Sequence, residues 1–146
     1  MPKFSPILIF TGQANHAIKL YEKAFGAEVK VKMLYSDADP KDLQYKEEEK
    51  NFVYHAQIKI GEQILMLGDD SAAVPQDGAI ATPNKSFLID IVVDFDSDDE
   101  LKSAYEVLSD GATITTPLCN QTYCSLTCAL VDKFGGRWQL MSGYKG

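Results

Sequence analysis

The chain has 146 residues, 45% of them hydrophobic and 24% charged, which is typical of a soluble globular domain and unlike disordered or fibrous proteins. Its formal net charge of -7 argues against nucleic acid and anionic membranes as partners, because both attract clustered Lys and Arg. No apolar stretch is long enough to span a membrane and residues 1–10 do not resemble an export signal, so we expect a cytoplasmic protein.

The first 26 residues predict a strand followed by an amphipathic helix. Ile7–Phe10 is a short apolar run with β-branched residues, which favours a strand. Residues 14–25 place their apolar side chains on one helical stripe, so we predict a helix there. Gly26 is in position to end that helix, because glycine readily adopts the left-handed conformation of a C-terminal cap.

The next part of the chain predicts an exposed strand and a polar insertion. Residues 28–35 alternate between apolar and polar side chains, which would place Val29, Val31 and Met33 on one face. Residues 36–50 are rich in charge and too hydrophilic for a core, so we expect a mobile loop or a short surface helix.

The first half then ends in a hairpin and a linker. The strand-like runs 52–60 and 63–67 are separated only by Gly61-Glu62, and glycine at the first central position suits a type II′ turn. Residues 69–85 contain several Pro and Gly residues and predict a linker between two halves.

The second half predicts the same order of elements. Ser97 suits the N-cap of a helix over residues 98–109, and Glu100 stands at the capping-box position. Asp110-Gly111 is expected to end that helix. The remaining strand-like runs are 87–95, 112–115, 122–131 and 137–142.

The two halves also resemble each other, since Ile7–Phe10 aligns with residues 90–93 and Tyr21 with Tyr105. We therefore infer an internal duplication. One domain is predicted over residues 1–146, with a first module over 1–70 and a second over 86–146. A single helix and a few strands cannot bury a whole core alone, so the modules are expected to pair.

Three cysteines, Cys119, Cys124 and Cys128, are expected to be reduced, because an odd number without an export signal argues against a disulfide framework. Their spacing lacks the paired CxxC pattern of a zinc site. Cys124 and Cys128 share strand parity with Leu126 and Leu130, which favours packing in the core.

Four segments, two in each module, carry a resemblance to a known family. They are GQANHAIKLYEKAFG at 12–26, YHAQIKIGEQILMLG at 54–68, LIDIVVD at 88–94 and VDKFGGRWQL at 131–140. Together they resemble the vicinal oxygen chelate superfamily, which includes glyoxalase I, bleomycin-resistance proteins and extradiol dioxygenases, and within it the PhnB-like branch. Residues 132–138 are similar to that branch's Asp-Pro-Phe-Gly-His-Arg-Trp, from which Lys133 and Gly136 depart.

The resemblance implies an α+β fold in which two βαβββ modules form a cup-shaped mixed sheet, the glyoxalase/bleomycin-resistance fold. Metal-using members hold a divalent ion in the cup through four residues, and the corresponding positions here are Pro6, Met66, Leu88 and Gln139. None of these is a good ligand for such an ion. We therefore expect no metal and no other cofactor. The family also implies a homodimer, in which a second chain can cover exposed strand edges.

Strand alternation predicts which side chains line the cup. In 87–93 the residues Phe87, Ile89, Ile91 and Val93 suit the helix-packed side, which leaves Leu88, Asp90 and Val92 to the cup. Counting back from the hairpin turn puts His55 and Gln57 on the face of Met66.

The last strand and the first complete this predicted lining. Arg137, Gln139 and Met141 share the cup parity, whereas Trp138 and Leu140 turn to the helix. Leu8 and Phe10 are expected to supply apolar wall. The predicted ligand-binding residues are thus Phe10, His55, Gln57, Met66, Leu88, Asp90, Arg137 and Gln139.

Two functions are compatible with this lining. The first is a metal-free protein that binds a small organic ligand in its cup, as bleomycin-resistance proteins do. The alternative is a small-molecule lyase, isomerase or related enzyme, with or without a metal, in which His55 and Asp90 or Gln139 transfer a proton on a small carbonyl or phosphonate-like substrate. His55 would be the acid or base, and Asp90 or Arg137 would orient it. No catalytic residue is assigned on this basis.

Overall fold

The computed structural model describes residues 2–70 and 89–145. The chain divides into two compact units, Met1–Ile80 and Ala81–Gly146, and each is described by itself. Residues 71–85 of the predicted linker and residues 87 and 88 of the predicted strand lie outside the described residues. Within the described ranges, no helix is long and apolar enough to cross a membrane.

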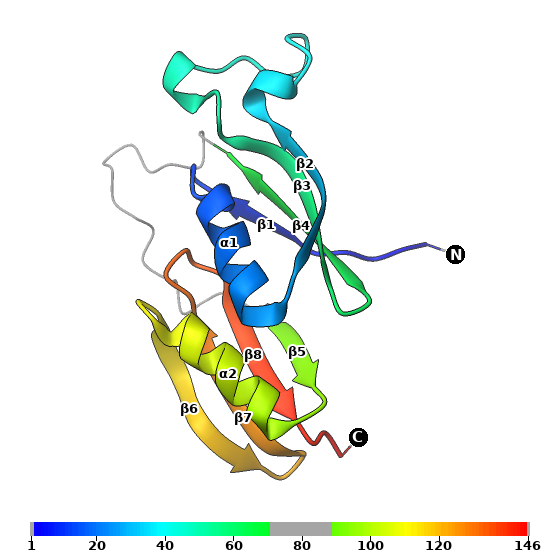
Figure 1. The fold of residues 1–146 in the computed structure, drawn as a ribbon, viewed down its shortest axis with the longest axis vertical. Helices are drawn as coiled ribbons and strands as arrows, with labels where there is room; N and C mark the ends of the chain where they lie inside the picture. Colours follow the sequence, from blue (N-terminus) through cyan, green and yellow to red (C-terminus); the bar gives the residue numbers. More distant parts are fainter. Residues whose placement is uncertain (1, 71–88, 146) are drawn as a thin grey trace. The chain divides into compact units, whose positions relative to one another are not determined.

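Over its described residues, the first unit contains one α-helix and a four-stranded mixed sheet (Figure 1). Its elements are β1 (Ile7–Phe10), α1 (Ala14–Phe25), β2 (Glu28–Leu34), β3 (Val53–Ile60) and β4 (Gln63–Asp69). The strand order is β1-β4-β3-β2, with β1 parallel to β4 and the other pairs antiparallel.

The second unit repeats this topology, which confirms the two predicted βαβββ modules. Its strand order is β5-β8-β7-β6, and again only the first pair is parallel. Its elements are β5 (Ile91–Phe95), α2 (Asp98–Ser109), β6 (Thr113–Gln121), β7 (Cys124–Val131) and β8 (Arg137–Ser142).

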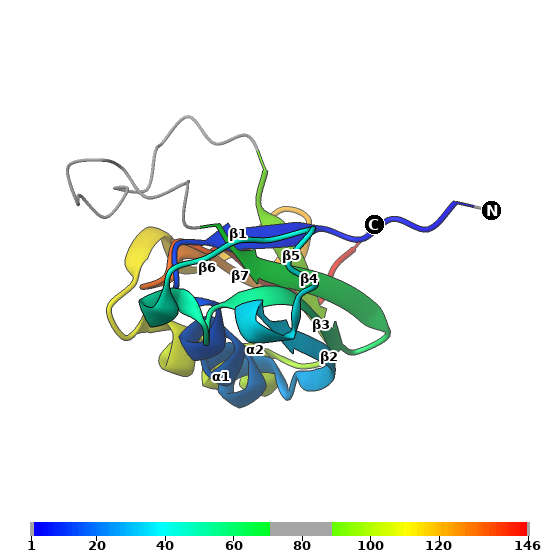
Figure 2. The ribbon, with the colours of Figure 1, turned by 90° about the horizontal axis from the view of Figure 1, so that it is seen from above.

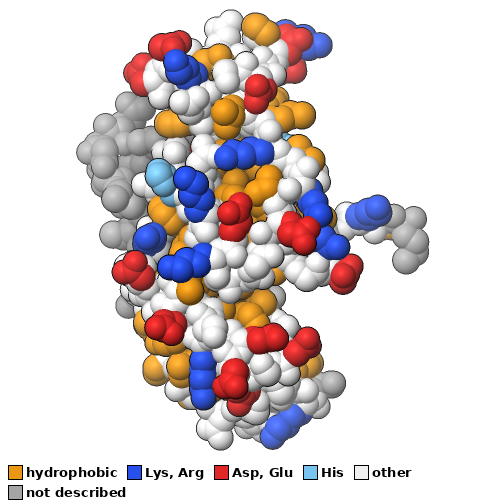
Figure 3. Space-filling view, viewed as in Figure 1, with side chains coloured by type: hydrophobic (Ala, Val, Ile, Leu, Met, Phe, Trp, Pro, Cys, Tyr) orange, Lys and Arg blue, Asp and Glu red, His pale blue; other side chains and the backbone are white. Residues whose placement is uncertain are grey.

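In each unit the helix covers one face of its own sheet and buries the apolar residues of that face. In the first unit, Figure 2 shows α1 on one side of the sheet. The fully or almost fully buried side chains there include Ala17, Ile18, Tyr21, Ala56, Ile58, Leu65 and Leu67. Charged side chains of both signs are interspersed around α1 on its outer side (Figure 3), so the helix is amphipathic as its sequence pattern predicts.

The core of the second unit confirms that Cys124 and Cys128 pack as apolar residues, since they are 1% and 0% exposed. Burial raises the pKa of the Cys128 thiol to about 11. The other core residues of this unit include Leu101, Ala104, Leu108, Leu130, Trp138 and Leu140.

The helix ends follow the predicted signals. Gly26 has a φ of 64° and caps α1, and its N–H donates to the Glu22 carbonyl. The Ser97 hydroxyl accepts from the Glu100 N–H at 3.2 Å, which makes it the N-cap of α2. The hairpin between β3 and β4 turns at Gly61-Glu62. Gly61 has a φ of 57°, whereas Glu62, like every described non-glycine residue, does not have a positive φ. Positive φ at the first central position alone is what a type II′ turn requires.

A buried carboxylate, Asp69 at the end of β4, holds the start of α1. Gln13 occupies the N-cap without a side-chain cap, and the Asp69 carboxylate instead accepts from the N–H groups of Gly12 and Ala14 at 2.8 and 3.1 Å. It also accepts from the Val53 N–H at 2.8 Å. The beginning of the helix therefore depends on a residue more than fifty positions away in the chain.

A second buried carboxylate, Asp132, organises the loop between β7 and β8. It accepts from the N–H groups of Phe134 and Gly136, each at 2.9 Å, and from the Trp138 indole N–H at 2.8 Å. Residues 132–138, which are similar to the motif of the PhnB-like branch, are thus organised around the side chain of Asp132.

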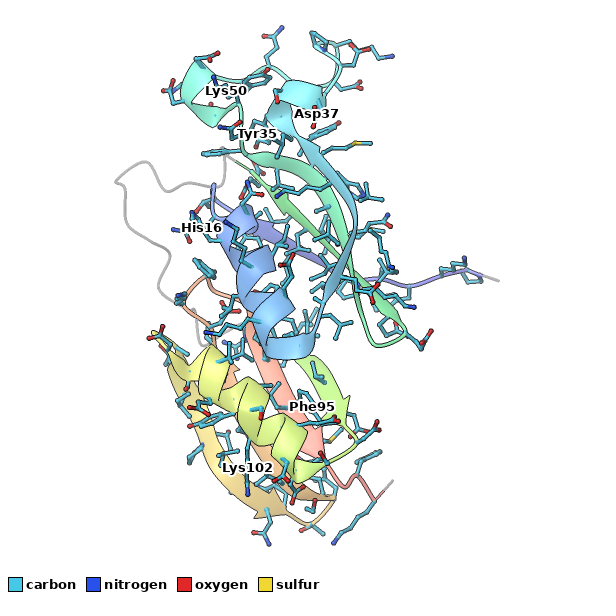
Figure 4. All side chains as sticks on the ribbon, in the orientation of Figure 1. His16, Tyr35, Asp37, Lys50, Phe95 and Lys102 are labelled. Carbon is cyan, nitrogen blue, oxygen red and sulfur yellow. The ribbon has the colours of Figure 1, made fainter. Side chains whose placement is uncertain are left out.

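The polar insertion after β2 contains two short 3-10 helices, Tyr35–Asp37 and Glu47–Glu49, in agreement with the predicted surface helix. Tyr35 anchors it: its ring lies 5.9 Å from Tyr45 and 5.6 Å from Phe52, and its hydroxyl donates to the Asp69 carbonyl at 2.8 Å. Figure 4 shows Tyr35 at the base of this insertion, close to Lys50, whose carbonyl accepts from the Ser36 N–H.

Three strand predictions are wrong in detail, and irregular register explains two of them. A bulge in β2 places Val29 opposite Ile58 but Val31 opposite Gln57, so the apolar residues of that strand do not share one face. β6 continues to Gln121 through Pro117, because it is an edge strand whose register shifts accommodate proline. Ile89 precedes β5 and is 76% exposed, so it is not packed under the helix.

Candidate functional site

The open face of the first sheet, opposite α1, presents apolar side chains with a few polar ones. In register across this face lie Ile7 of β1, Met66 of β4 and Gln57 of β3. Ile9 follows Ile7 on the same face, and the two are 55% and 51% exposed. Their exposure on a sheet face marks a surface that the unit's own core does not use.

His55 and Gln57 are neighbours on this face, as the alternation predicts. Their side chains approach to 3.4 Å between His55 Nε2 and Gln57 Nε2, and both residues are half-buried. Met33, opposite His55 on β2, is 46% exposed. The amide is therefore in position to orient the imidazole, beside an apolar neighbour.

The open face of the second sheet carries Arg137, Gln139 and Met141. Each is half-buried, whereas Trp138 and Leu140, which alternate with them, are completely buried on the helix side. Ile91 and Val93 lie opposite Trp138 and Leu140, so they also belong to the helix side, as predicted.

Asp90 and Arg137 form an ion pair on this face. Arg137 Nε donates to Asp90 Oδ1 at 2.9 Å, and the two side chains are 20% and 34% exposed, with Arg137 the more buried. Alternation predicts that both lie on this face, but the pairing itself is a structural finding. It supplies the partner that a partly buried carboxylate needs.

Tyr123 is a residue of this face that the sequence reasoning missed. It lies in the turn between β6 and β7, and its hydroxyl accepts from Gln139 Nε2 at 3.1 Å. The predicted strand 122–131 includes Tyr123, with parity opposite to the core residue Cys124, but β7 begins only at Cys124 and alternation does not indicate which side chain the Tyr123 hydroxyl meets. The second open face thus holds two polar pairs, Asp90 with Arg137 and Gln139 with Tyr123.

Phe10 lies on the other side of its sheet from the one expected. It is 5% exposed, and its neighbour Leu8 is opposite the buried Leu67, which places both on the helix-packed face. The expected apolar wall is instead formed by Ile7 and Ile9. A run of four apolar residues shows no alternation, so its facing depends on pairing with β4.

The remaining predicted site residues belong to different parts of the chain. Leu88 lies outside the described residues. His55, Gln57 and Met66 are in the first unit, and Asp90, Arg137 and Gln139 are in the second. Their convergence in one cup, and the cooperation of His55 with Asp90, stay predictions.

The side chains at the positions that bind metal in the resembling family do not fit a divalent ion. Gln139 offers one amide oxygen and its amide nitrogen is bonded to Tyr123, Met66 offers a thioether, and Pro6 offers no side-chain donor. Within residues 2–70 and 89–145, no three His, Cys, Asp or Glu side chains gather as a metal site would require.

Two mixed sheets of identical strand order, each covered by one helix, define a protein of the glyoxalase fold. The model of the Glyoxalase/Bleomycin resistance protein/Dioxygenase superfamily matches residues 3–140 of the chain. The chain therefore belongs to this superfamily. Among curated proteins, none matches it.

Several solved structures share this fold over almost the whole chain. Protein PA1353 from Pseudomonas aeruginosa is 22% identical with a TM-score of 0.79, covering 97% of this chain and 98% of that one. A protein from Bacillus cereus described as PhnB and as a putative 3-demethylubiquinone-9 3-methyltransferase is 24% identical with a TM-score of 0.74, covering 97% and 99%. The fosfomycin resistance protein FosX from Listeria monocytogenes is 12% identical with a TM-score of 0.62, covering 98% and 93%. At these identities the likeness is one of fold.

Proposed function

We propose that this protein binds a small organic ligand on the open faces of its sheets, without a resident metal. The observation that supports this most is the Asp90–Arg137 ion pair, which lies on a sheet face that the helix does not cover. Neither side chain contributes to the apolar core of its unit. Polar groups on an uncovered apolar face are the groups that orient a ligand in small-molecule sites.

The composition of the two open faces supports the same proposal. Binding sites for small molecules are mostly apolar, with a few polar groups that orient the ligand. The first open face supplies apolar area through Ile7, Ile9 and Met66, together with His55 and Gln57. The second open face has the two polar pairs described above beside the half-buried Met141, so each face combines apolar and polar groups by itself.

The proposal is tested by a thermal shift screen of the purified protein against a chemically diverse library. A ligand that binds only the folded chain stabilises it by mass action and so raises Tm. At a ligand concentration of about a hundred times Kd, the free energy of unfolding increases by about 2.7 kcal/mol. Ligands found in the screen should bind the His55→Ala or the Arg137→Gln variant more weakly than they bind wild type. The control is Asp42→Ala, at an exposed residue of the insertion, which should bind these ligands as tightly as wild type does.

Metal independence is tested on the same hits. We expect the Tm increase to persist after dialysis against a chelator, and elemental analysis to find no stoichiometric divalent metal. Loss of the shift on chelation, with recovery on adding one divalent ion, would overturn the metal-free part of the proposal. Hits that are indifferent to every open-face substitution would overturn its location.

An enzymatic role for His55 is the second candidate, and the contact with Gln57 favours it. An amide at 3.4 Å can hold the imidazole in one orientation, which general acid–base catalysis requires. Once a ligand is known, NMR would show whether it is converted. Turnover by wild type that is lost in His55→Gln, with binding retained, would establish catalysis, whereas an unchanged ligand supports binding alone.

A further inference from the structure

We propose that the ligand of the second unit carries an oxyanion, such as a carboxylate, phosphonate or phosphate group, and that Arg137 binds it through the terminal nitrogens of its guanidinium. This inference rests on the proposed function and adds the chemical class of the ligand. It follows from which nitrogen of Arg137 donates to Asp90 and from the N–H donors of the guanidinium that Asp90 does not accept from.

Asp90 engages only one edge of the guanidinium. Its Oδ1 accepts from Arg137 Nε at 2.9 Å, and this is the one polar interaction of the arginine side chain with described residues. An arginine has five N–H donors, so four remain on the two terminal nitrogens. Those donors form the planar fork that matches two oxygens of a carboxylate or phosphonate.

The surroundings of Arg137 make this fork a stronger ligand than a surface cation. Its side chain is only 20% exposed, and its register partner on the neighbouring strand β7 is Val131, which is 2% exposed. A partly desolvated guanidinium attracts an anion more strongly than one in bulk water. The bond to Asp90 also holds the side chain, so that less conformational entropy is lost when a ligand binds.

The neighbouring charges do not prevent anion binding. Asp90 balances Arg137, so the pair itself is neutral. Asp94, the next carboxylate on this face, is four strand positions from Asp90, roughly 13 Å. That exceeds the Debye length of about 8 Å at physiological ionic strength. Lys133, in the loop before Arg137, is exposed and lies 3.9 Å from Asp110, so it belongs to a different surface charge pair.

Tyr123 and Gln139 offer a second contact beside this fork. Gln139 follows Arg137 by two positions on the same strand face, roughly 7 Å away. Its amide donates to the Tyr123 hydroxyl at 3.1 Å, which leaves the phenol proton available for a ligand. A small organic acid could therefore place its oxyanion on Arg137 and a carbonyl or hydroxyl on Tyr123.

The experiment compares three probes that share one ring: benzoate, phenylphosphonate and the neutral benzamide. Their affinities for the full chain are measured by calorimetry, together with the variants Arg137→Gln and Arg137→Lys. Lys133→Gln is the matched control, because it removes the same charge from the adjacent loop. Circular dichroism confirms that each variant is folded.

We expect at least one of the two anions to bind wild type and Lys133→Gln equally, and benzamide to bind at least about tenfold more weakly. Arg137→Gln should lose at least about tenfold in anion affinity. Arg137→Lys keeps the charge and the pairing with Asp90 but not the fork, so it should show a smaller loss with the fold intact. Which anion binds better distinguishes a carboxylate ligand from a phosphonate or phosphate.

Three results would overturn the oxyanion assignment. They are equal anion binding by wild type and Arg137→Gln, benzamide binding as tight as benzoate, and no binding of either anion at millimolar concentration. None of these results decides whether the protein binds a small organic ligand at all, because the thermal shift screen tests that proposal separately. A library hit that is neutral and sensitive to Arg137→Gln would retain the site and reject the ligand class.

Discussion

Asp132 is the residue on which the loop before β8 most depends. Its carboxylate accepts from two backbone N–H groups and from the buried Trp138 indole, so one side chain satisfies three donors. Asp69 has the same role in the first unit, where it accepts from three N–H groups. Buried donors that lose their acceptor cost more than the hydrogen bond itself contributes.

We therefore expect Asp132→Ala to lower the free energy of unfolding by at least about 3 kcal/mol, since the donors left behind cost about 1–3 kcal/mol each. Urea denaturation followed by Trp138 fluorescence measures the change. The control is Asp42→Ala, at an exposed aspartate, which should change stability by less than about 0.5 kcal/mol. Equal effects of the two substitutions would contradict the assigned role.

The helices are the elements whose ends the structure explains best. α1 is bounded by two glycines of positive φ, Gly12 at 105° and Gly26 at 64°. A Cβ at Gly12 would lie 2.7 Å from the Phe52 ring, whereas one at Gly26 would meet no atom within 4 Å. Both positions disfavour other residues, but only Gly12 also lies against a packed aromatic ring.

The two glycines provide a matched pair of substitutions. Gly26→Ala should cost roughly 1 kcal/mol through backbone strain alone. Gly12→Ala should cost at least about 1 kcal/mol more, because Phe52 must move as well. Urea denaturation of both variants decides this. A Gly12→Ala variant that is no less stable than Gly26→Ala would show that the Phe52 ring can move without a loss of stability.

At the start of α2, Asp98 makes stability depend on pH. Hydrogen bonds from Ser142 and Ser125 hold the pKa of its carboxyl below the usual 3.8. A carboxyl whose pKa is lower in the folded state stabilises the fold above its unfolded pKa. That contribution disappears as pH falls through the folded value.

Asp98→Asn should therefore be less stable than wild type at pH 6, and the difference should shrink below about pH 4 as the wild-type carboxyl becomes protonated. Urea denaturation at pH 6 and pH 3 measures both differences. A gap that stays constant between these pH values would mean that the charge of Asp98 is irrelevant to its hydrogen bonds.

For the whole molecule, we propose a homodimer. The edge strands of the sheets are β1 and β2 in one unit and β5 and β6 in the other, and Ile7 and Ile9 on β1 expose apolar surface. A second chain could cover such edges and side chains. Light scattering at micromolar concentration should give about twice the chain mass of 16.2 kDa. A monomer under these conditions would contradict the proposal.

The sequence by itself determined the order of elements, its repetition in the second half, the C-cap of α1 and the N-cap of α2. These features depend on local signals, such as the amphipathic stripe of 14–25, the cap at Ser97 and the glycine turn at Gly61. It also assigned Arg137 and Gln139 to the open face, because Trp138 and Leu140 between them are plainly apolar.

Tertiary structure alone decided which groups meet. The facing of Phe10 follows from its pairing with β4, and the facing of Val29 from a bulge opposite β3. The partners of Asp69, Asp90 and Asp132 were likewise not predicted. Strand register and side-chain contacts join residues far apart in the chain, and no local periodicity encodes them.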